Sequence, residues 1–141
     1  MNTIKTIVEW GIIGLLLSLS VWAVAVALER GRLYRNVAVT KFTSRVRLEK
    51  ELTQRLAVIS TIAANAPYIG LLGTVLGIML TFEALGSSGD MDVKTIMTGL
   101  ALALKATAFG IGVAIPCVAM NNTLRRRVRE LLAEYDEARG G

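Results

Sequence analysis

The sequence contains no histidine and a single cysteine, Cys117. Without imidazoles there are no histidine-based metal sites and no histidine-based acid–base catalysis, and a lone cysteine excludes an internal disulfide. Cys117 lies beside Pro116 in an apolar segment, so we interpret it as a small core residue and not as a reactive thiol, which needs an electropositive setting. With no nucleophile–base pair in view, the sequence predicts no enzyme, no cofactor and no metal site.

Charged side chains are nearly absent from three long stretches. Residues 10–28 and 56–82 carry no charge, and residues 95–124 are interrupted before the end only by Lys105. A bilayer core about 30 Å thick needs roughly 20 mostly apolar residues per helix. In a chain of 141 residues that is 53 % hydrophobic, these continuous runs predict an all-α membrane protein with three transmembrane helices, and they exclude an alternating membrane barrel.

Basic residues gather between the first two apolar stretches and after the third, whereas the second connection is mainly acidic. The positive-inside rule therefore places the N-terminus outside and both basic clusters in the cytoplasm. The net charge of +5 does not indicate nucleic-acid binding in this context. We expect arginines near the membrane to attract anionic phospholipids, each by about 1 kcal/mol. The candidate lipid-contact residues are Arg30, Arg32, Arg35, Arg125, Arg126 and Arg127.

The pattern predicts a single membrane domain over residues 1–141. We expect transmembrane helices at about 8–28, 57–85 and 95–121, a short outer loop at 86–94 and a cytoplasmic helical tail at 122–141. Apolar residues recur at near-helical spacing in residues 29–56, which contain no glycine after Gly31. We therefore expect this cytoplasmic segment to be helical and to run without a break into the second transmembrane helix.

The first apolar stretch has two interpretations. Alanines at 23, 25 and 27 form a weak signal-peptide cleavage pattern. Against cleavage, Glu9 replaces the expected positive n-region, and the basic RGRLYR follows at once. We interpret the stretch as a retained membrane anchor.

Two apolar stretches carry a threonine among small residues. They read APYIGLLGTVLGIML (66–80) and ALKATAFGIGVAIP (103–116). At about 100° per residue, small residues fall within about 60° of each threonine. Close helix–helix packing is the more favoured interpretation on composition alone, and a pore lining is the alternative. Within this arc lie Gly70, Gly77 and Thr81 around Thr74, and Ala103, Gly110 and Ala114 around Thr107; Gly73, one position before Thr74, is a further candidate for close helix packing.

Proline lies inside both threonine-bearing stretches. Pro67 cannot donate its backbone hydrogen bond and disfavours helix at the preceding residue, so we expect a kink near residues 65–67. Pro116 is the corresponding candidate kink in the third stretch.

These two stretches resemble the second- and third-helix motifs of the MotA/TolQ/ExbB family of proton-channel proteins, and most closely its short ExbB branch. The resemblance is clearest over residues 65–79 and 99–121. It implies a pentameric ring whose second and third helices surround a pore in a bacterial inner membrane. It further implies an ExbD-like single-span partner that brings an aspartate, and a TonB-like protein that carries the work to outer-membrane transport. Thr74 and Thr107 match the family's pore threonines.

One position departs from the family pattern. Members often have a glutamate five residues before the third-helix threonine, where this chain has Leu102. Lys105 is the charged residue inside the third stretch, and Glu83 is its candidate partner in an intramembrane charge pair. Two alternatives to the ExbB-type motor remain open: a TolQ-type subunit that serves envelope integrity, and a non-conducting scaffold whose hairpin only packs.

Overall fold

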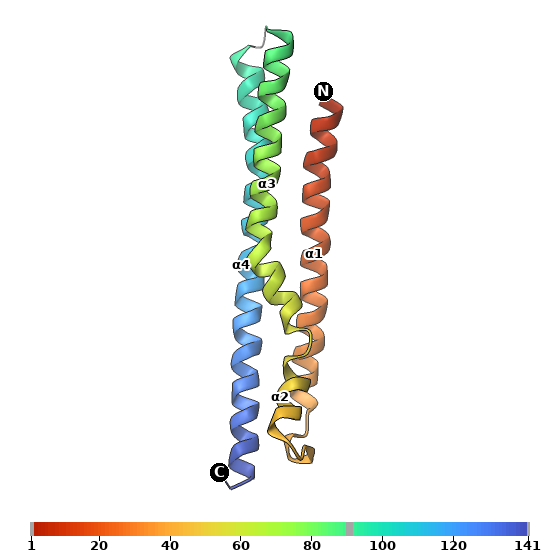
Figure 1. Cartoon of the computed structure of the whole chain (residues 1–141), viewed down its shortest axis with the longest axis vertical. Coiled ribbons are helices and arrows are strands. Elements are labelled where there is room, and N and C mark those ends of the chain that lie inside the picture. The colour runs from red at the N-terminus through yellow and green to blue at the C-terminus, as the bar shows by residue number, and fades with distance from the viewer. Residues whose placement is uncertain (1, 90–91, 141) are drawn as a thin grey trace.

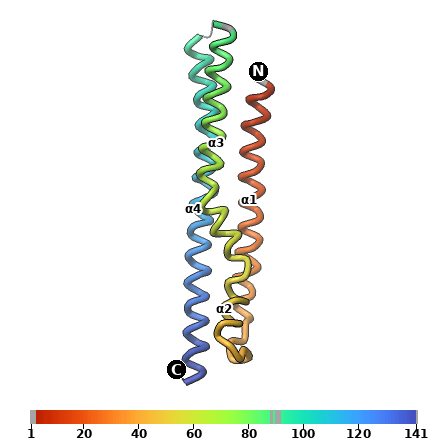
Figure 2. The backbone as a smooth tube through the Cα atoms, in the orientation of Figure 1, coloured from red at the N-terminus to blue at the C-terminus, as the bar shows by residue number. Residues whose placement is uncertain are grey.

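The computed structural model describes residues 2–89 and 92–140. Three helices are long, α1 (Asn2–Asn36), α3 (Leu56–Ser88) and α4 (Val93–Ala138), and α2 (Arg45–Thr53) is short. Figures 1 and 2 show an elongated bundle in which α3 and α4 lie side by side and α1 runs along them. The N-terminus lies toward the end with the α3–α4 connection, whereas the C-terminus lies at the end that holds α2.

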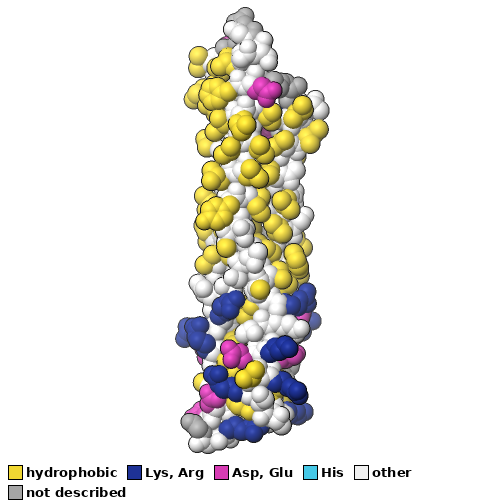
Figure 3. All heavy atoms as spheres, viewed as in Figure 1, with side chains coloured by type: hydrophobic (Ala, Val, Ile, Leu, Met, Phe, Trp, Pro, Cys, Tyr) yellow, Lys and Arg dark blue, Asp and Glu magenta, His cyan; other side chains and the backbone are white. Residues whose placement is uncertain are grey.

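The three long helices are apolar and long enough to cross a membrane, as the sequence predicts. All three exceed the roughly 20 residues that a bilayer core requires, so they extend beyond it. Helix α4 has 46 residues, which corresponds to about 69 Å of helix. In Figure 3, lysine and arginine side chains gather at the end with α2 and the C-terminus, and hydrophobic side chains predominate over the rest of the visible face.

The connection between α1 and α3, which the charge pattern predicts to be cytoplasmic, corrects the expectation of a continuous helix over residues 29–56. Helix α1 ends at Asn36, a 3-10 turn spans Val39–Lys41, and α2 is followed by a second break before α3. In that break Arg55 has a left-handed backbone with φ 69°. Since α1 and α3 pack side by side in opposite directions, the chain must reverse here, and a continuous helix cannot do so.

Burial explains why α2 folds back against the bundle. Leu48 and Leu52 of α2 have no exposed surface and pack with the adjoining ends of α1, α3 and α4. Full burial of each leucine contributes about 1.5–3 kcal/mol. A second buried cluster lies in the apolar part of the bundle and contains smaller side chains, including Ala63, Ala66 and Ala114.

The turn between α3 and α4 is capped on both sides. Gly89 ends α3 with φ 65°, and its N–H donates to the Leu85 carbonyl at 2.8 Å. A carboxylate oxygen of Asp92 accepts a hydrogen bond from the Thr95 N–H at 2.9 Å and begins α4. Residues 90 and 91 of the expected outer loop lie outside the described residues.

Candidate functional site

The two threonines that the sequence analysis singled out meet between α3 and α4. Their hydroxyl oxygens are hydrogen-bonded to each other. Thr74 also donates to the Ala103 carbonyl at 2.8 Å, and Thr107 lies 3.5 Å from the Gly70 carbonyl. Each threonine thus joins its own helix to the other, and the pair lies in the hydrophobic half of the bundle.

The hydroxyl protons of this pair can be assigned by counting. A threonine hydroxyl carries one proton and two acceptor lone pairs. If Thr74 donates to the Ala103 carbonyl, it can only accept from Thr107, so Thr107 is the donor within the pair. Thr74 is buried, with 6 % of its surface exposed, whereas Thr107 is half-buried. Thr107 is therefore the more exposed residue of the pair.

Glycines let the two helices approach closely around the pair. A Cβ atom on Gly110 would lie 2.5 Å from the Ala66 carbonyl oxygen and 3.0 Å from the Cα of Gly70. A Cβ on Gly70 would lie 2.5 Å from the carbonyl oxygen of Ala106. These neighbours are backbone atoms, which cannot move aside as a flexible side chain can. We call this contact line the α3–α4 seam; it contains Gly70, Gly73, Gly77, Ala103, Ala106 and Gly110.

The small-residue stripes of the two helices therefore face each other within one chain. Gly77 packs on Ala103, and Gly73 packs on Ala106 and on Ile12 of α1. Ala114 is buried in the second cluster together with Cys117. The structure brings the predicted small residues and both threonines together at a single interface, and it leaves part of Thr107 for contact with another molecule.

The two prolines are both inside helices. Helix α3 continues through Pro67 and α4 through Pro116. The first turns of α3 run obliquely to the rest of that helix, whereas α4 shows no comparable bend in this view (Figure 1). Asn65 lies near this bend and donates its side-chain amide to the Thr61 carbonyl at 2.8 Å.

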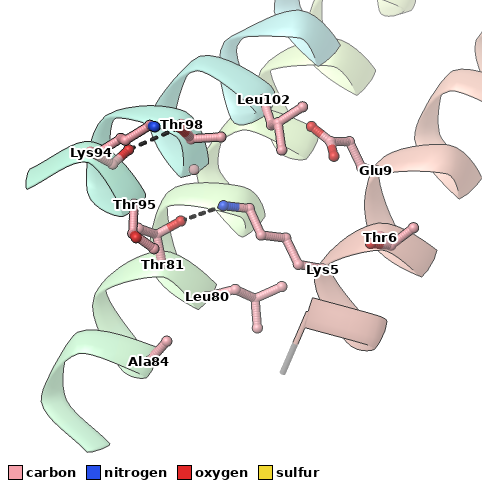
Figure 4. Close-up of a pocket in the computed structure, with 11 residues that line it drawn as sticks. Lys5, Thr6, Glu9, Leu80, Thr81, Ala84, Lys94, Thr95, Thr98 and Leu102 are labelled. Atoms are coloured by element: carbon pink, nitrogen blue, oxygen red, sulfur yellow. Dashed lines mark hydrogen bonds between the residues drawn. The ribbon is translucent and has the colours of Figure 1, made fainter. Parts of the chain in front are cut away.

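A pocket of about 460 Å³ lies between the first turns of α1 and the ends of α3 and α4 next to their connecting turn, which we call the outer ends after the orientation that the charge pattern predicts. Lys5 crosses this pocket and donates to the Thr81 hydroxyl at 2.7 Å (Figure 4). Glu9 points from α1 toward α4 beside Leu102. Within the described residues, the Glu9 Oε1 atom is buried and has no hydrogen-bond partner.

Sequence reasoning did not assign Glu9 or Lys5 to a site. The available signal was an ionisable pair at i and i+4 within an otherwise apolar N-terminal run, and intramembrane charges mark functional sites by default. The structure places a carboxylate of this chain near the outer half of the α3–α4 seam, next to the Leu102 position that lacks one.

The candidate charge pair of Glu83 and Lys105 is separated in the structure. Both side chains are exposed, and in the ranges 2–89 and 92–140 no ion pair joins them. Their sequence positions explain this, because Glu83 lies near the outer end of α3 while Lys105 lies deeper along α4.

The candidate lipid-contact arginines divide into two groups. Arg30 differs from the expectation, because it is buried and donates to the Glu51 carbonyl at 2.9 Å and to Glu29 at 2.7 Å. Glu29 also pairs with Arg55 at the second break. Arg127 pairs with Glu130 at 3.2 Å. The remaining arginines are exposed or half-exposed, toward the end of the bundle that holds α2; they are Arg32, Arg35, Arg125, Arg126 and Arg127.

Comparison of the sequence with known proteins shows the family to which the chain is related. The sequence model described as "MotA/TolQ/ExbB proton channel family" matches residues 34–137. The chain is 52 % identical over 140 residues to "Biopolymer transport protein ExbB" of Aquifex aeolicus, covering 99 % of this chain and 95 % of that protein. It is 46 % identical over 118 residues to the protein of the same name from Helicobacter pylori, covering 84 % and 79 %. "Tol-Pal system protein TolQ" of Haemophilus influenzae is 41 % identical over 86 residues, covering 61 % and 38 %.

Proposed function

Because this chain belongs to the MotA/TolQ/ExbB proton channel family, we propose that it is an ExbB-type subunit of a proton-driven motor. In this role it converts proton motive force into work that a TonB-like protein delivers to outer-membrane transport. The observation that carries the proposal is the Thr74–Thr107 pair, which lies in an apolar interface with close glycine contacts and in which Thr107 is only half-buried.

The Thr107 hydroxyl can interact with a carboxyl group of a partner protein in both of its protonation states. A protonated carboxyl can donate to the Thr107 oxygen while Thr107 keeps its own proton on Thr74. When that carboxyl ionises, Thr107 can turn its proton toward the carboxylate and release Thr74. The pair then serves both protonation states without a fixed charge, which would be expensive to bury in the membrane.

The proposal requires an assembly. An ExbD-like single-span partner would bring the carboxyl group, and copies of this chain, five by family resemblance, would surround it. Large apolar side chains cover the exposed faces of α3 and α4 and are available for lipid or for neighbouring copies. They include Leu71, Leu72, Val75, Met79, Leu104, Ile111 and Ile115.

The charge pattern supports a place in a bacterial inner membrane with the N-terminus outside and the C-terminus in the cytoplasm. The arginines that remain accessible at the cytoplasmic boundary, such as Arg32 and Arg35, are suited to anionic phospholipid headgroups. Arg30 is no longer included, because its guanidinium is buried in contacts within the chain.

A TolQ-type role is the second candidate, since a TolQ relative is 41 % identical over 86 residues. The TolQ role is less favoured than the ExbB role. The alignment covers 38 % of the TolQ relative but 95 % of the ExbB relative from Aquifex aeolicus.

Native mass spectrometry with and without a co-expressed single-span partner tests the proposal. The expected result is a ring of this chain that retains the partner, and loss of the partner when Thr107 is replaced by a larger residue such as leucine. A chain that never forms a ring, or a ring that never takes up the partner, would overturn the motor assignment.

A further inference from the structure

One buried carboxylate oxygen beside the outer pocket has no hydrogen-bond partner within the described residues. Glu9 Oε1 is buried without a donor in the part of the chain that the structure describes. A buried acceptor without a partner costs about 1–3 kcal/mol, so such an atom in a folded protein calls for a specific explanation.

Three polar side chains of the pocket make hydrogen bonds to groups other than the Glu9 carboxylate. Lys5 is one helical turn before Glu9 on α1 and could pair with it, yet its ammonium group donates to Thr81 instead. The Thr81 hydroxyl donates to the Gly77 carbonyl at 2.8 Å, and the Thr98 hydroxyl donates to the Lys94 carbonyl at 2.9 Å. The carboxylate is therefore left to interact with something that enters the pocket.

Contacts along α1 give the depth of Glu9. Lys5 meets Thr81, and Ile12 lies against Gly73, so Glu9 is level with the region of Gly77 between them. That level is about one helical turn, or ~5.4 Å along the axis, from the Thr74–Thr107 pair. The pocket is lined by the first turns of α1 and by residues on both sides of the α3–α4 turn, the end that the charge pattern assigns to the outside.

We propose that Glu9 is a proton-binding residue of this chain, which exchanges protons with the outer aqueous phase through the pocket. Uptake forms an O–H bond on the carboxylate and breaks one in a hydronium ion, which leaves as water; release reverses both steps. Protonation removes the charge of a partly buried carboxylate, and hydration through the pocket gives the proton its route. The inference rests on the proposed function only for the direction of net proton movement.

The charged groups that face this site set its electrostatics. Lys5 contributes one positive charge from α1 and Lys94 contributes another from α4, whereas α3 contributes only the Thr81 hydroxyl and apolar side chains to the pocket wall.

Infrared difference spectroscopy of the full chain in lipid nanodiscs, titrated with acid, tests the inference. We expect a carbonyl band of a protonated carboxylic acid that disappears in Glu9→Gln and persists in Glu83→Gln, a matched change at an exposed carboxylate outside the pocket. Glu9→Asp keeps a carboxyl group and should retain a shifted band, which separates loss of the proton site from misfolding. A band unchanged in Glu9→Gln would overturn the inference.

Proton flux in proteoliposomes that contain the chain and its single-span partner separates this inference from the proposed function. Glu9→Gln should lower flux by about tenfold or more, in line with the roughly 10²-fold contribution of positioned proton-transfer groups. If wild type conducts and Glu9→Gln conducts equally, Glu9 is not on the route. If wild type does not conduct while the Glu9 band titrates, the motor assignment fails and the proton site stands.

Discussion

Thr74 on α3 and Thr107 on α4 share a hydrogen bond between their hydroxyl groups at the centre of the α3–α4 seam. They are 33 positions apart in sequence, so the contact depends on the antiparallel arrangement of the two helices. The pair connects two helices. Because Thr107 is only half-buried, we propose that its hydroxyl also contacts another molecule.

A double-mutant cycle should detect this hydrogen bond. Thr74→Val and Thr107→Val preserve shape and remove the hydroxyls, and the coupling free energy between them should be about 0.6 kcal/mol and at most ~1.7 kcal/mol, the range for interhelical hydrogen bonds in membranes. Steric-trapping measurements of the free energy of unfolding in bicelles give this value. Strict additivity of the two changes would show that the hydroxyls do not interact.

Close approach at Gly110 gives a second prediction. Gly110→Ala places a Cβ 2.5 Å from the Ala66 carbonyl oxygen, so the helices must separate, at a cost of about 1–3 kcal/mol. Gly112→Ala is the matched control on the same helix, because a Cβ there meets no atom within 4 Å. The thermal midpoint of the first variant should fall, while the control should be neutral or slightly stabilised. Equal behaviour of the two variants would argue against close seam contact.

The three membrane helices and the threonine–glycine seam could be predicted from the sequence because both depend on patterns of residues that are close together in the chain. Apolar length predicts the spans, and helical periodicity gathers the small residues on one face. The break before α3 carried no such signal. Arg55 adopts a left-handed backbone without the glycine that usually marks it, and its ion pair with Glu29 comes from another helix.

Glu9 was missed for a related reason. Glu9 stands out because its buried Oε1 atom has no hydrogen-bond donor within the described residues. Only the three-dimensional structure shows that Lys5 donates to Thr81 and not to Glu9. From sequence alone, Lys5 and Glu9 form an ordinary i, i+4 pair near a chain end.

The left-handed backbone at Arg55 predicts that glycine is more stable than alanine at this position, the reverse of their order inside a helix. Arg55→Gly and Arg55→Ala both remove the ion pair with Glu29, but glycine also relieves a left-handed conformation that costs about 1–2 kcal/mol. The glycine variant should therefore be more stable than the alanine variant by about 1 kcal/mol. At Lys50, inside α2 and exposed, alanine should be more stable than glycine by a similar amount. The same order at both positions would contradict the assigned break.

The N-cap of α4 predicts a specific acid sensitivity. Hydrogen bonds from the side chain and backbone of Thr95 hold the pKa of Asp92 below its ordinary value of 3.8. Because the folded-state pKa is depressed, this contribution to stability is present above the unfolded value and is lost as pH falls through the folded value. Thermal unfolding of wild type and Asp92→Asn should show a midpoint difference that is constant near neutral pH and shrinks in acid below about pH 4. A difference that is independent of pH would show that the carboxylate charge does not contribute.

The central claim is that the Thr74–Thr107 pair serves proton-driven work and not helix contact alone. Its most direct test is proton flux into proteoliposomes that hold the full chain with its single-span partner, compared between wild type, Thr107→Ser and Thr107→Val at matched ring assembly. The hydroxyl-bearing serine variant should retain most of the flux, and the valine variant should lose it while the ring and the bound partner persist. Full flux in the valine variant would contradict the claim and leave the hairpin as a scaffold.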